Sequence, residues 1–476
     1  MKSSKPIKLL VMGSLFILMQ ACAPTASLKK PEVDLPKQYV SGAKDDANTA
    51  AIQWKDFFED PALLRLIETA VSNNKEVNIM LQRMYIAQNE IQERKGEYLP
   101  FVSVGVGAEV ENVGHYTING AAEETLHIIE EEEIPQYLAN YEFGVSASWE
   151  IDVWKKLRNS AQVAALEYMA SKEGRNFLVT NLVAEIAHSY YELVALDNQL
   201  VNLDQNIQLQ EKGIEVIKQL KQYGRANLLA IKRLQGEMSK NKAEMYEIMQ
   251  EIIEVENKIN VLLGRTPQPI QRSSGGFLNF RPKMIQAGIP SQLLQNRPDI
   301  RQAELELTAA DLNIDVAKAN FYPSLEIKAW YGYQAFQTAY LFSPESAALL
   351  LAGEIVAPIF NRSAILANYK NADARQIQAA YEYEQKVINA YTEVANNISS
   401  LGNLEKQYQL KNEQVRALTE SIELVNQLFK SARAEYLEVL LTQREALEAN
   451  MELIEIKRKQ ISGTVDLYRT LGGGWN

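Results

Sequence analysis

The chain has 476 residues, 46% of them hydrophobic, and a formal net charge of −11 at pH 7. This hydrophobic share is enough to form a folded core, so the composition argues against a disordered chain. The acidic balance gives the whole molecule no attraction for nucleic acid, so we expect no nucleic-acid partner. The single cysteine, Cys22, excludes an internal disulfide and any CxxC metal or redox site.

The N-terminus has the three-part pattern of a secretory signal, which predicts a signal peptide over residues 1–21. Three lysines precede an apolar run over residues 9–19, which is too short for a comfortable transmembrane helix. Cys22 follows the small residue Ala21, and this arrangement resembles the bacterial lipoprotein processing site, where the thiol is lipidated after cleavage. Ala23 resembles the residue of lipoproteins that are sent to the outer membrane. The alternative is an ordinary cleaved signal with a chance cysteine.

Residues 22–60 contain prolines and mixed charge with little periodicity, so we expect an extended arm that carries the lipid. Beyond it, apolar residues recur every seven positions within residues 154–222: Val179, Ile186, Leu193, Leu200, Ile207 and Ile214. Sustained heptads predict a helix that supercoils with a partner, and 69 residues of helix would be about 100 Å long. Gly224 ends this pattern, and a second helix over about residues 227–263 should return as a hairpin.

The chain also contains an internal duplication. Residues 74–104 align without gaps on residues 297–327, with Pro100 on Pro323, and residues 186–200 align on residues 387–401. We therefore predict a first repeat over residues 61–264, a linker over 265–298, a second repeat over 299–471 and a tail over 472–476. The extra residues of the first repeat fit best in a loop over 111–140.

Each repeat contains two candidate strands. They are residues 101–110 and 141–153 in the first repeat, and 324–333 and about 349–360 in the second. In the first three strands, apolar residues alternate with small or charged ones, which indicates one apolar and one polar face. In the fourth strand, alternation alone does not show which residues share a face. Such an apolar face either covers a soluble core or faces lipid. Four strands cannot close a barrel, and an open edge cannot lie in lipid, so a membrane barrel requires several copies.

Several short motifs in this order resemble the outer-membrane efflux factors, the TolC-like and OprM-like channels, over nearly the whole mature chain. They are residues 149–154 (WEIDVW), 183–187 (VAEIA), 262–264 (LLG), 288–294 (GIPSQLL), 297–300 (RPDI), 321–323 (FYP), 436–440 (YLEVL) and 471–475 (LGGGW). The lipoprotein signal is similar to that of the branch associated with resistance-nodulation-division pumps.

The resemblance implies a mainly α protein with a membrane β-barrel portion: a homotrimer whose twelve strands, four per chain, are continued by a long periplasmic helical barrel. It implies a passive outer-membrane duct, anchored by lipid, that receives drugs or other small toxic molecules from a periplasmic adaptor and an inner-membrane efflux transporter. Two alternatives remain. They are a type I protein-secretion duct and a lipid-anchored periplasmic coiled-coil scaffold.

The resemblance also implies roles for particular residues. The two hairpin tips would contact the adaptor through Tyr223, Gly224, Arg225, Asn227, Ser431, Arg433 and Glu435. Glu438 stands where family members place an acidic gate residue, although it could equally be a solvated helix residue, and Ala432 stands where the family prefers glycine. On the polar strand faces, acidic residues would line the lumen: Glu109, Glu142, Glu150 and Asp152.

The hypothesis that the chain is an enzyme has little support. GxxxxGK[ST], HExxH and GxSxG motifs do not occur, and the three histidines are scattered along the sequence. We expect no catalytic activity, no cofactor and no metal site. Any energy for transport must then come from a partner.

Overall fold

The computed structural model describes residues 27–39, 48–123, 125–129, 132–224, 227–360 and 362–475. The predicted signal peptide, Cys22 and Arg225 lie outside these residues. The described residues form two compact units: a strand unit within residues 27–30, 86–168 and 305–380, and a helical unit within residues 31–39, 48–85, 169–304 and 381–475. Each unit therefore takes segments from both sequence repeats.

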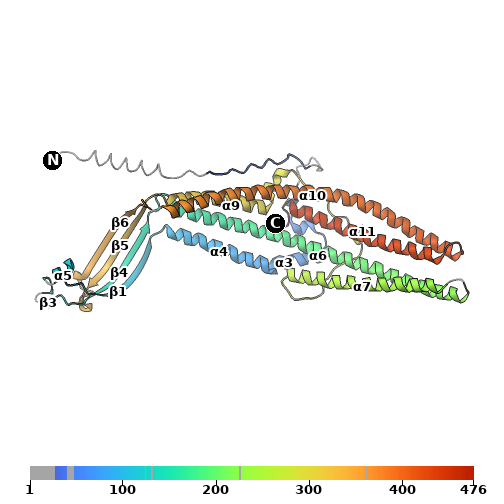
Figure 1. Cartoon of the computed structure of the whole chain (residues 1–476), viewed down its shortest axis with the longest axis horizontal. Coiled ribbons are helices and arrows are strands. Elements are labelled where there is room, and N and C mark those ends of the chain that lie inside the picture. Colours follow the sequence, from blue (N-terminus) through green and yellow to red (C-terminus); the bar gives the residue numbers. More distant parts are fainter. Residues whose placement is uncertain are drawn as a thin grey trace. The chain divides into compact units, whose positions relative to one another are not determined.

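Figure 1 labels most of the elements. The α-helices are α2 (Trp54–Phe57), α3 (Pro61–Asn73), α4 (Lys75–Glu97), α5 (Ile118–Glu123), α6 (Lys156–Gln222), α7 (Leu228–Leu262), α8 (Leu293–Asn296), α9 (Pro298–Ala319), α10 (Ser363–Lys430) and α11 (Tyr436–Thr470). The strands are β1 (Phe101–Glu111), β2 (His127–Ile129), β3 (Glu132–Glu133), β4 (Leu138–Glu150), β5 (Ser324–Ala335) and β6 (Ala347–Val356). Short 3-10 helices are η1 (Thr49–Ala51), η2 (Phe277–Asn279), η3 (Pro290–Gln292), η4 (Thr338–Tyr340) and η5 (Pro344–Ser346). Among the described residues, none of the helices has the length and apolar character of a membrane span.

The main sheet of the strand unit is antiparallel, in the order β1-β4-β5-β6. All four predicted strands form, with shifted bounds. The second begins three residues early and ends at Glu150, and the fourth covers Ala347–Val356 and stops before Pro358, whose ring could not continue the ladder. The loop between β1 and β4 contains the short elements α5, β2 and β3.

The long helix α6 confirms the heptad prediction. It runs for 67 residues, and of the six heptad positions only Leu200 is not fully buried. It begins at Lys156, two residues after the expected start. At the return, the Asn227 side chain accepts a hydrogen bond from the Ala230 N–H and caps α7.

The largest core of the helical unit lies where α3, α6 and α11 meet. Tyr190 of α6 is fully buried and donates its hydroxyl to the Asp60 carboxylate at 2.5 Å. Phe57 stacks on Tyr468 of α11 with ring centroids 4.0 Å apart. Burial of these aromatic rings fixes the start of the first repeat against the end of the second.

The internal duplication is visible in the helical unit as two matching junctions. In the first, the Asn74 side chain at the start of α4 donates to the Leu262 carbonyl at the end of α7, at 2.9 Å. In the second, Arg297 before α9 donates to the Thr470 carbonyl at the end of α11, at 3.1 Å. In each case the return helix ends where the helix that leads into a strand begins.

A glycine with positive φ closes both junctions. Gly264 has φ +68°, and a Cβ there would lie 2.6 Å from the Asn73 carbonyl oxygen; Gly472 has φ +97°, and a Cβ there would lie 2.5 Å from the Asn296 carbonyl oxygen. Both positions require glycine because the left-handed backbone and the close approach each exclude a side chain. The two LGG/LLG motifs thus occupy equivalent structural positions.

Candidate functional site

The register of the main sheet separates one apolar face from one polar face. In a typical row, Val104 lies opposite Val145, which lies opposite Tyr331, which lies opposite Leu349. The apolar face also carries Val102, Val106, Val110, Phe143, Trp149, Ile327, Tyr333, Leu351 and Ile355. Most of these large side chains are exposed in the single chain. Such a large exposed apolar surface marks contact with lipid or another protein.

Aromatic residues lie at both ends of this apolar face. Near the helices, the Trp149 indole donates to the Tyr98 carbonyl at 3.1 Å. At the other end, Phe342 contacts Phe143 and Tyr333 with ring centroids 6.0 and 5.9 Å apart. Aromatic belts at both ends of an apolar strand band are typical of membrane interfaces.

The polar face carries three of the four acidic residues selected from the sequence: Glu109, Glu142 and Glu150. Sequence reasoning did not select Glu326 and Glu354, which lie beside Glu150 in one row across β4, β5 and β6. Alternation in β5 could have identified Glu326, whereas the ambiguous pattern of β6 hid Glu354. The face is therefore more acidic than predicted.

Bases compensate for this row of like charges. Lys328 forms ion pairs with Glu326 at 3.3 Å and with Glu354 at 3.5 Å. Lys156 forms an ion pair with Glu150 at 2.8 Å. Without these bases, carboxylates directly opposite one another would repel and destabilise the strand pairing.

The prediction that Asp152 is a strand acid is wrong. β4 ends at Glu150, and the Asp152 carboxylate instead accepts hydrogen bonds from the Leu157 N–H at 3.1 Å and the Arg158 N–H at 2.9 Å. Lys155, with φ +59°, turns the chain between the strand and α6. Asp152 thus caps the first turn of the long helix, where unpaired N–H groups favour a carboxylate.

We expect Asp152→Ala to lower the free energy of unfolding by about 1 kcal/mol, because two N–H donors lose their acceptor. The change should be localised: hydrogen exchange should accelerate at the start of α6. Asp152→Asn retains an acceptor oxygen and serves as the matched variant, with a smaller effect. Unchanged exchange in the alanine variant would contradict the capping role.

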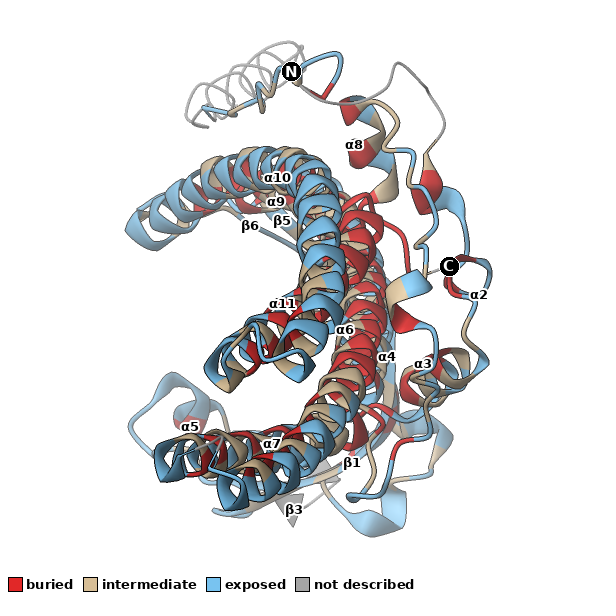
Figure 2. Ribbon diagram, turned by 90° about the vertical axis from the view of Figure 1, so that its right-hand side faces the viewer, coloured by how far each residue is buried: buried red, intermediate tan, exposed pale blue. Residues whose placement is uncertain are grey.

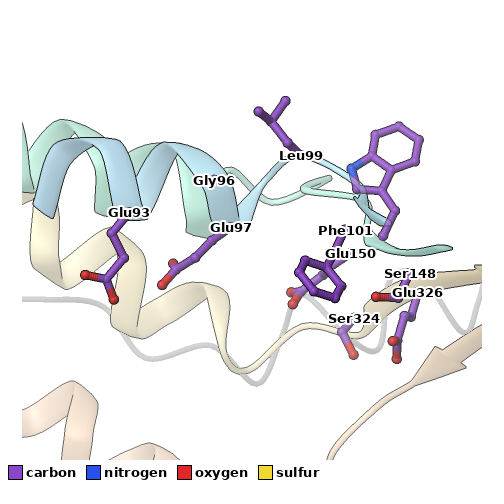
Figure 3. Close-up of a pocket in the computed structure, with 10 residues that line it drawn as sticks. Glu93, Gly96, Glu97, Leu99, Phe101, Ser148, Glu150, Ser324 and Glu326 are labelled. Atoms are coloured by element: carbon purple, nitrogen blue, oxygen red, sulfur yellow. The ribbon is translucent and has the colours of Figure 1, made fainter. Parts of the chain in front are cut away.

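A cavity of about 490 Å³ lies where α4 meets the ends of β4 and β5. It is lined by Glu93, Gly96, Glu97, Leu99, Phe101, Ser148, Trp149, Glu150, Ser324 and Glu326. Figure 3 shows the carboxylates of Glu93 and Glu97 on one side of α4 and Leu99 on the other. Glu97 forms an ion pair with Arg94 at 2.9 Å, and Glu150 and Glu326 have the lysine partners described above. No group of metal-binding side chains is found among the described residues.

The first hairpin tip, between α6 and α7, is exposed. Gly224 has φ +71° and donates its N–H to the Lys221 carbonyl at 3.0 Å. Tyr223, Leu228 and Leu229 are all exposed there. Tyr223, Gly224 and Asn227, which the sequence predicts to contact an adaptor, therefore lie at this tip beside the two exposed leucines.

The second tip, between α10 and α11, contains a positive-φ turn at the position where the family prefers glycine. Ala432 has φ +58°, in a region that disfavours residues with a Cβ. Ser431 donates its hydroxyl to the Leu428 carbonyl at 2.9 Å, and the Arg433 N–H donates to the same carbonyl at 2.9 Å. Glu435 is the N-cap residue of α11 but makes no capping bond with its side chain. This tip is therefore less well capped than the first.

Ala432→Gly should stabilise the second tip by about 1 kcal/mol, since glycine adopts this backbone conformation without a steric penalty. Slower hydrogen exchange at the end of α10 and the start of α11 would be the expected result. The opposite change at the first tip, Gly224→Ala, should accelerate exchange there by a similar factor. An Ala432→Gly variant with faster exchange would contradict this account.

The gate candidate Glu438 lies exposed on the first turn of α11. Leu437 and Leu441 next to it are also exposed. Tyr436 points inward instead: its hydroxyl would lie 2.1 Å from a Cβ at Gly213 of α6, and burial raises its pKa. The two hairpins thus touch near their tips, a contact that the sequence did not predict.

Comparisons with known proteins agree with this arrangement. The model of the outer membrane efflux protein family matches residues 66–265 and 289–473. The probable outer membrane lipoprotein SilC of Salmonella typhimurium is 26% identical over 98% of this chain and 99% of its own length. The toluene efflux pump outer membrane protein TtgI of Pseudomonas putida is 26% identical over 100% of this chain and 98% of its own length.

The fold is also that of a solved channel. The open state of the MtrE outer membrane channel of Neisseria gonorrhoeae matches with a TM-score of 0.84 at 24% identity, covering 96% of this chain and 99% of that one. The two-faced sheet and the exposed hairpin tips therefore occur in a fold known from an outer-membrane channel. Because the family model matches most of the chain, this protein belongs to the outer membrane efflux protein family and is an outer-membrane efflux channel.

Proposed function

We propose that three copies of the chain form one passive duct through the outer membrane. Its β-barrel would contain the four main strands of each copy, with the apolar face toward lipid and the polar face toward water. The observation that carries this proposal is the strand register, which places every charged side chain of the main sheet on one face and leaves the other face without charge, although Trp330 and Leu350 also lie on the polar face. No energy source or catalytic step is needed in the channel itself.

The sheet edges support assembly from several copies. β1 and β6 are the two edge strands of the main sheet, and the antiparallel order makes them run in opposite directions. β6 of one copy can therefore pair with β1 of the next in the antiparallel manner of the rest of the sheet. Closure is required because an unpaired edge cannot lie in hydrocarbon.

The lumen of this barrel would be acidic. Glu109, Glu142 and Glu150 share the polar face with Glu326 and Glu354. Fixed carboxylates attract cations and repel anions within a Debye length. We expect cation preference, and Gln substitution of Glu109 and Glu142, which form no ion pairs with other described residues, should reduce it.

The N-terminal arm supports a lipid anchor at Cys22. The Ser27 N–H donates to the Asp373 carboxylate at 3.0 Å, and the Lys29 N–H donates to the Gln376 side chain at 3.0 Å, so this part of the arm follows α10 toward its N-terminus. Cys22 precedes Ser27 by five residues, which can span at most about 18 Å. α10 follows β6 in the chain, so the acyl chains of a lipidated Cys22 would enter the membrane near the end of the barrel.

The hairpin tips of the helical unit would bind a periplasmic adaptor. Both tips expose polar residues beside apolar ones, a combination found in protein interfaces. The adaptor would connect the duct to an inner-membrane efflux transporter. Glu438, repeated three times around the axis, would contribute like charges to a constriction, beside the exposed Leu437 and Leu441.

We propose small toxic organic molecules as the cargo. TtgI is named for toluene efflux, and the family model describes efflux. Among the residues that the structure describes, no group of metal-binding side chains occurs.

Reconstitution of the full-length lipoprotein into a planar bilayer tests the duct. Discrete conductance steps with a cation-selective reversal potential are the expected result. The Glu109→Gln/Glu142→Gln variant should conduct with a reversal potential closer to zero. Properly folded trimers without any conductance, including after truncation of both tips, would favour a periplasmic scaffold and overturn the proposal.

A further inference from the structure

Two large apolar side chains interrupt the polar face of the main sheet. Trp330 of β5 lies directly opposite Leu350 of β6, and both share this face with the glutamates described above. Leu350 is 58% exposed, and Trp330 is half-buried. A barrel face toward water has no core that requires such side chains, so their position calls for an explanation other than core packing.

A row of glycines lies beside Trp330 on the same face. Gly105 of β1 pairs with Gly144 of β4, which pairs with Gly332 of β5. A Cβ at Gly144 would lie 2.7 Å from the Trp330 ring, and a Cβ at Gly332 would lie 2.9 Å from it. The benzene part of the indole therefore covers the backbone of these two glycines. Any larger residue at either position would displace the ring.

The burial of the strand residues supports this arrangement. Buried residues concentrate along the long helices, as Figure 2 shows for α6 and α11. Among the described residues of the four main strands, only Gly144, Gly332 and Ala335 are buried. Two of these three are the glycines beneath the indole. One side of the ring is thus fixed against the sheet.

The polar group of Trp330 is left for a ligand. The Trp149 and Trp154 indoles donate their N–H groups to backbone carbonyls at 3.1 and 2.7 Å. The Trp330 indole makes no hydrogen bond with another residue that the structure describes, and no aromatic side chain of that part of the chain stacks on it. Trp330 therefore differs from these two tryptophans, whose polar groups hold the fold together.

The charges around Trp330 favour a cation as the ligand. Glu142 lies one row beyond the glycines on the same face and forms no ion pair with another described residue. Lys328 lies one row away on the other side, but its charge is offset by its ion pairs with Glu326 and Glu354. The face of an indole is negative and attracts a cation more strongly than other aromatic side chains do.

We infer that Trp330 forms a contact site for organic cations in the lumen of the duct. The indole face binds the positive group, Leu350 contacts the adjoining apolar part, and Glu142 adds attraction from the next rows. This inference rests on the proposed duct, because it takes the polar face to line the lumen, and it deepens that proposal by naming a class of cargo. Such contacts are weak, so the cargo also leaves again, as conduction requires.

Quenching of tryptophan fluorescence tests the site in the purified full-length trimer. The two probes are nicotinamide, which is neutral, and the cation formed by methylation of its ring nitrogen. The difference between the parent and Trp330→Leu isolates the signal of Trp330. We expect the cation to quench half of this signal at a concentration about fivefold lower than nicotinamide requires, because a cation–π contact adds attraction of this order.

Two glycine variants test whether the packing of the indole makes the site. Gly144→Ala and Gly105→Ala lie in the same row and keep Trp330 and every charge, so the general attraction of the acidic face is unchanged. The new Cβ at position 144 displaces the indole, whereas a Cβ at position 105 has no atom within 4 Å. Gly144→Ala should lose most of the preference for the cation, and Gly105→Ala should retain it.

The conductance of the same trimers separates the two possible failures. Trimers that conduct, but whose Trp330 signal is quenched equally by the two probes or by neither, would overturn the contact site and leave the duct in place. A conducting Gly144→Ala variant that keeps the full preference would also contradict the site. Parent trimers that do not conduct would overturn the duct, and the contact site with it.

Discussion

Replacing Arg297 with alanine is expected to lower the free energy of unfolding by about 3 kcal/mol, one of the two largest effects that we predict. Arg297 is 5% exposed and forms ion pairs with Asp299 at 2.7 Å and Glu393 at 2.9 Å. Burial disfavours its charge, but the two carboxylates more than offset this, and the pKa of Arg297 is raised. The alanine variant leaves the partly buried Asp299 carboxylate and the Thr470 carbonyl without their donor.

Denaturant unfolding in detergent, followed by tryptophan fluorescence, measures this loss. Arg94→Ala is the control, because the side chains of Arg94 and its partner Glu97 are 39% and 36% exposed, and solvent-exposed pairs contribute less than about 1 kcal/mol. Arg297→Lys should fall between the wild type and Arg297→Ala, since lysine keeps the charge but cannot bind Asp299 through two nitrogens. An Arg297→Ala variant as stable as Arg94→Ala would refute the role of this junction.

A second large effect is expected at the middle of β1. Val106, on the apolar face, is 79% exposed in the single chain. If this face contacts lipid, Val106→Arg places a charge near the bilayer centre and should cost about 2–4 kcal/mol. In a urea titration of the protein folded in lipid vesicles, the urea concentration at the midpoint of unfolding should fall accordingly.

The adjacent Gly105 provides the matched control. It lies on the polar face, and a Cβ there would have no atom within 4 Å. Gly105→Arg adds the same charge one residue away and should have a much smaller effect, because water in the lumen solvates the side chain. Equal losses for the two arginine variants would mean that the apolar face does not contact lipid.

Much of the strand unit could be predicted from the sequence, because alternation is a local signal. β1, β4 and β5 alternate over most of their length, so their faces follow from the sequence, although Phe101, Leu138 and Trp330 lie on the polar face. β6 reads Ala-Ala-Leu-Leu-Leu-Ala-Gly-Glu-Ile-Val, where apolar residues occupy both parities. Only its pairing with β5 shows that Leu349 and Leu351 share the apolar face while Glu354 lies on the polar one.

Strand ends were harder to predict than strands. Residues 151–153 continue the alternation of β4, so the pattern predicted a longer strand. The strand ends earlier because the Asp152 carboxylate binds the first N–H groups of α6, and this helix cap replaces the ladder. Capping competes with strand pairing through side-chain hydrogen bonds, which hydrophobic periodicity does not record.

At the hairpin tips, too, some features could be predicted from the sequence and others could not. The helix break at Gly224 could be read from the sequence, whereas alanine at position 432 disfavours the positive φ that the structure shows there. The contact of Tyr436 with Gly213 joins residues more than two hundred positions apart, and no local pattern encodes it. The exposure of the leucines at the tips could not be predicted either. A heptad pattern shows which residues share a helix face, but it does not show whether that face is covered.

The open edges at β1 and β6 have a further consequence for biogenesis. Before it assembles with other copies, a newly exported chain has two edge strands with unpaired backbone groups and a large exposed apolar surface. Such edge strands are templates for aberrant pairing and aggregation. We therefore expect that overproduction of the chain, faster than copies can assemble, yields insoluble aggregates in place of free subunits.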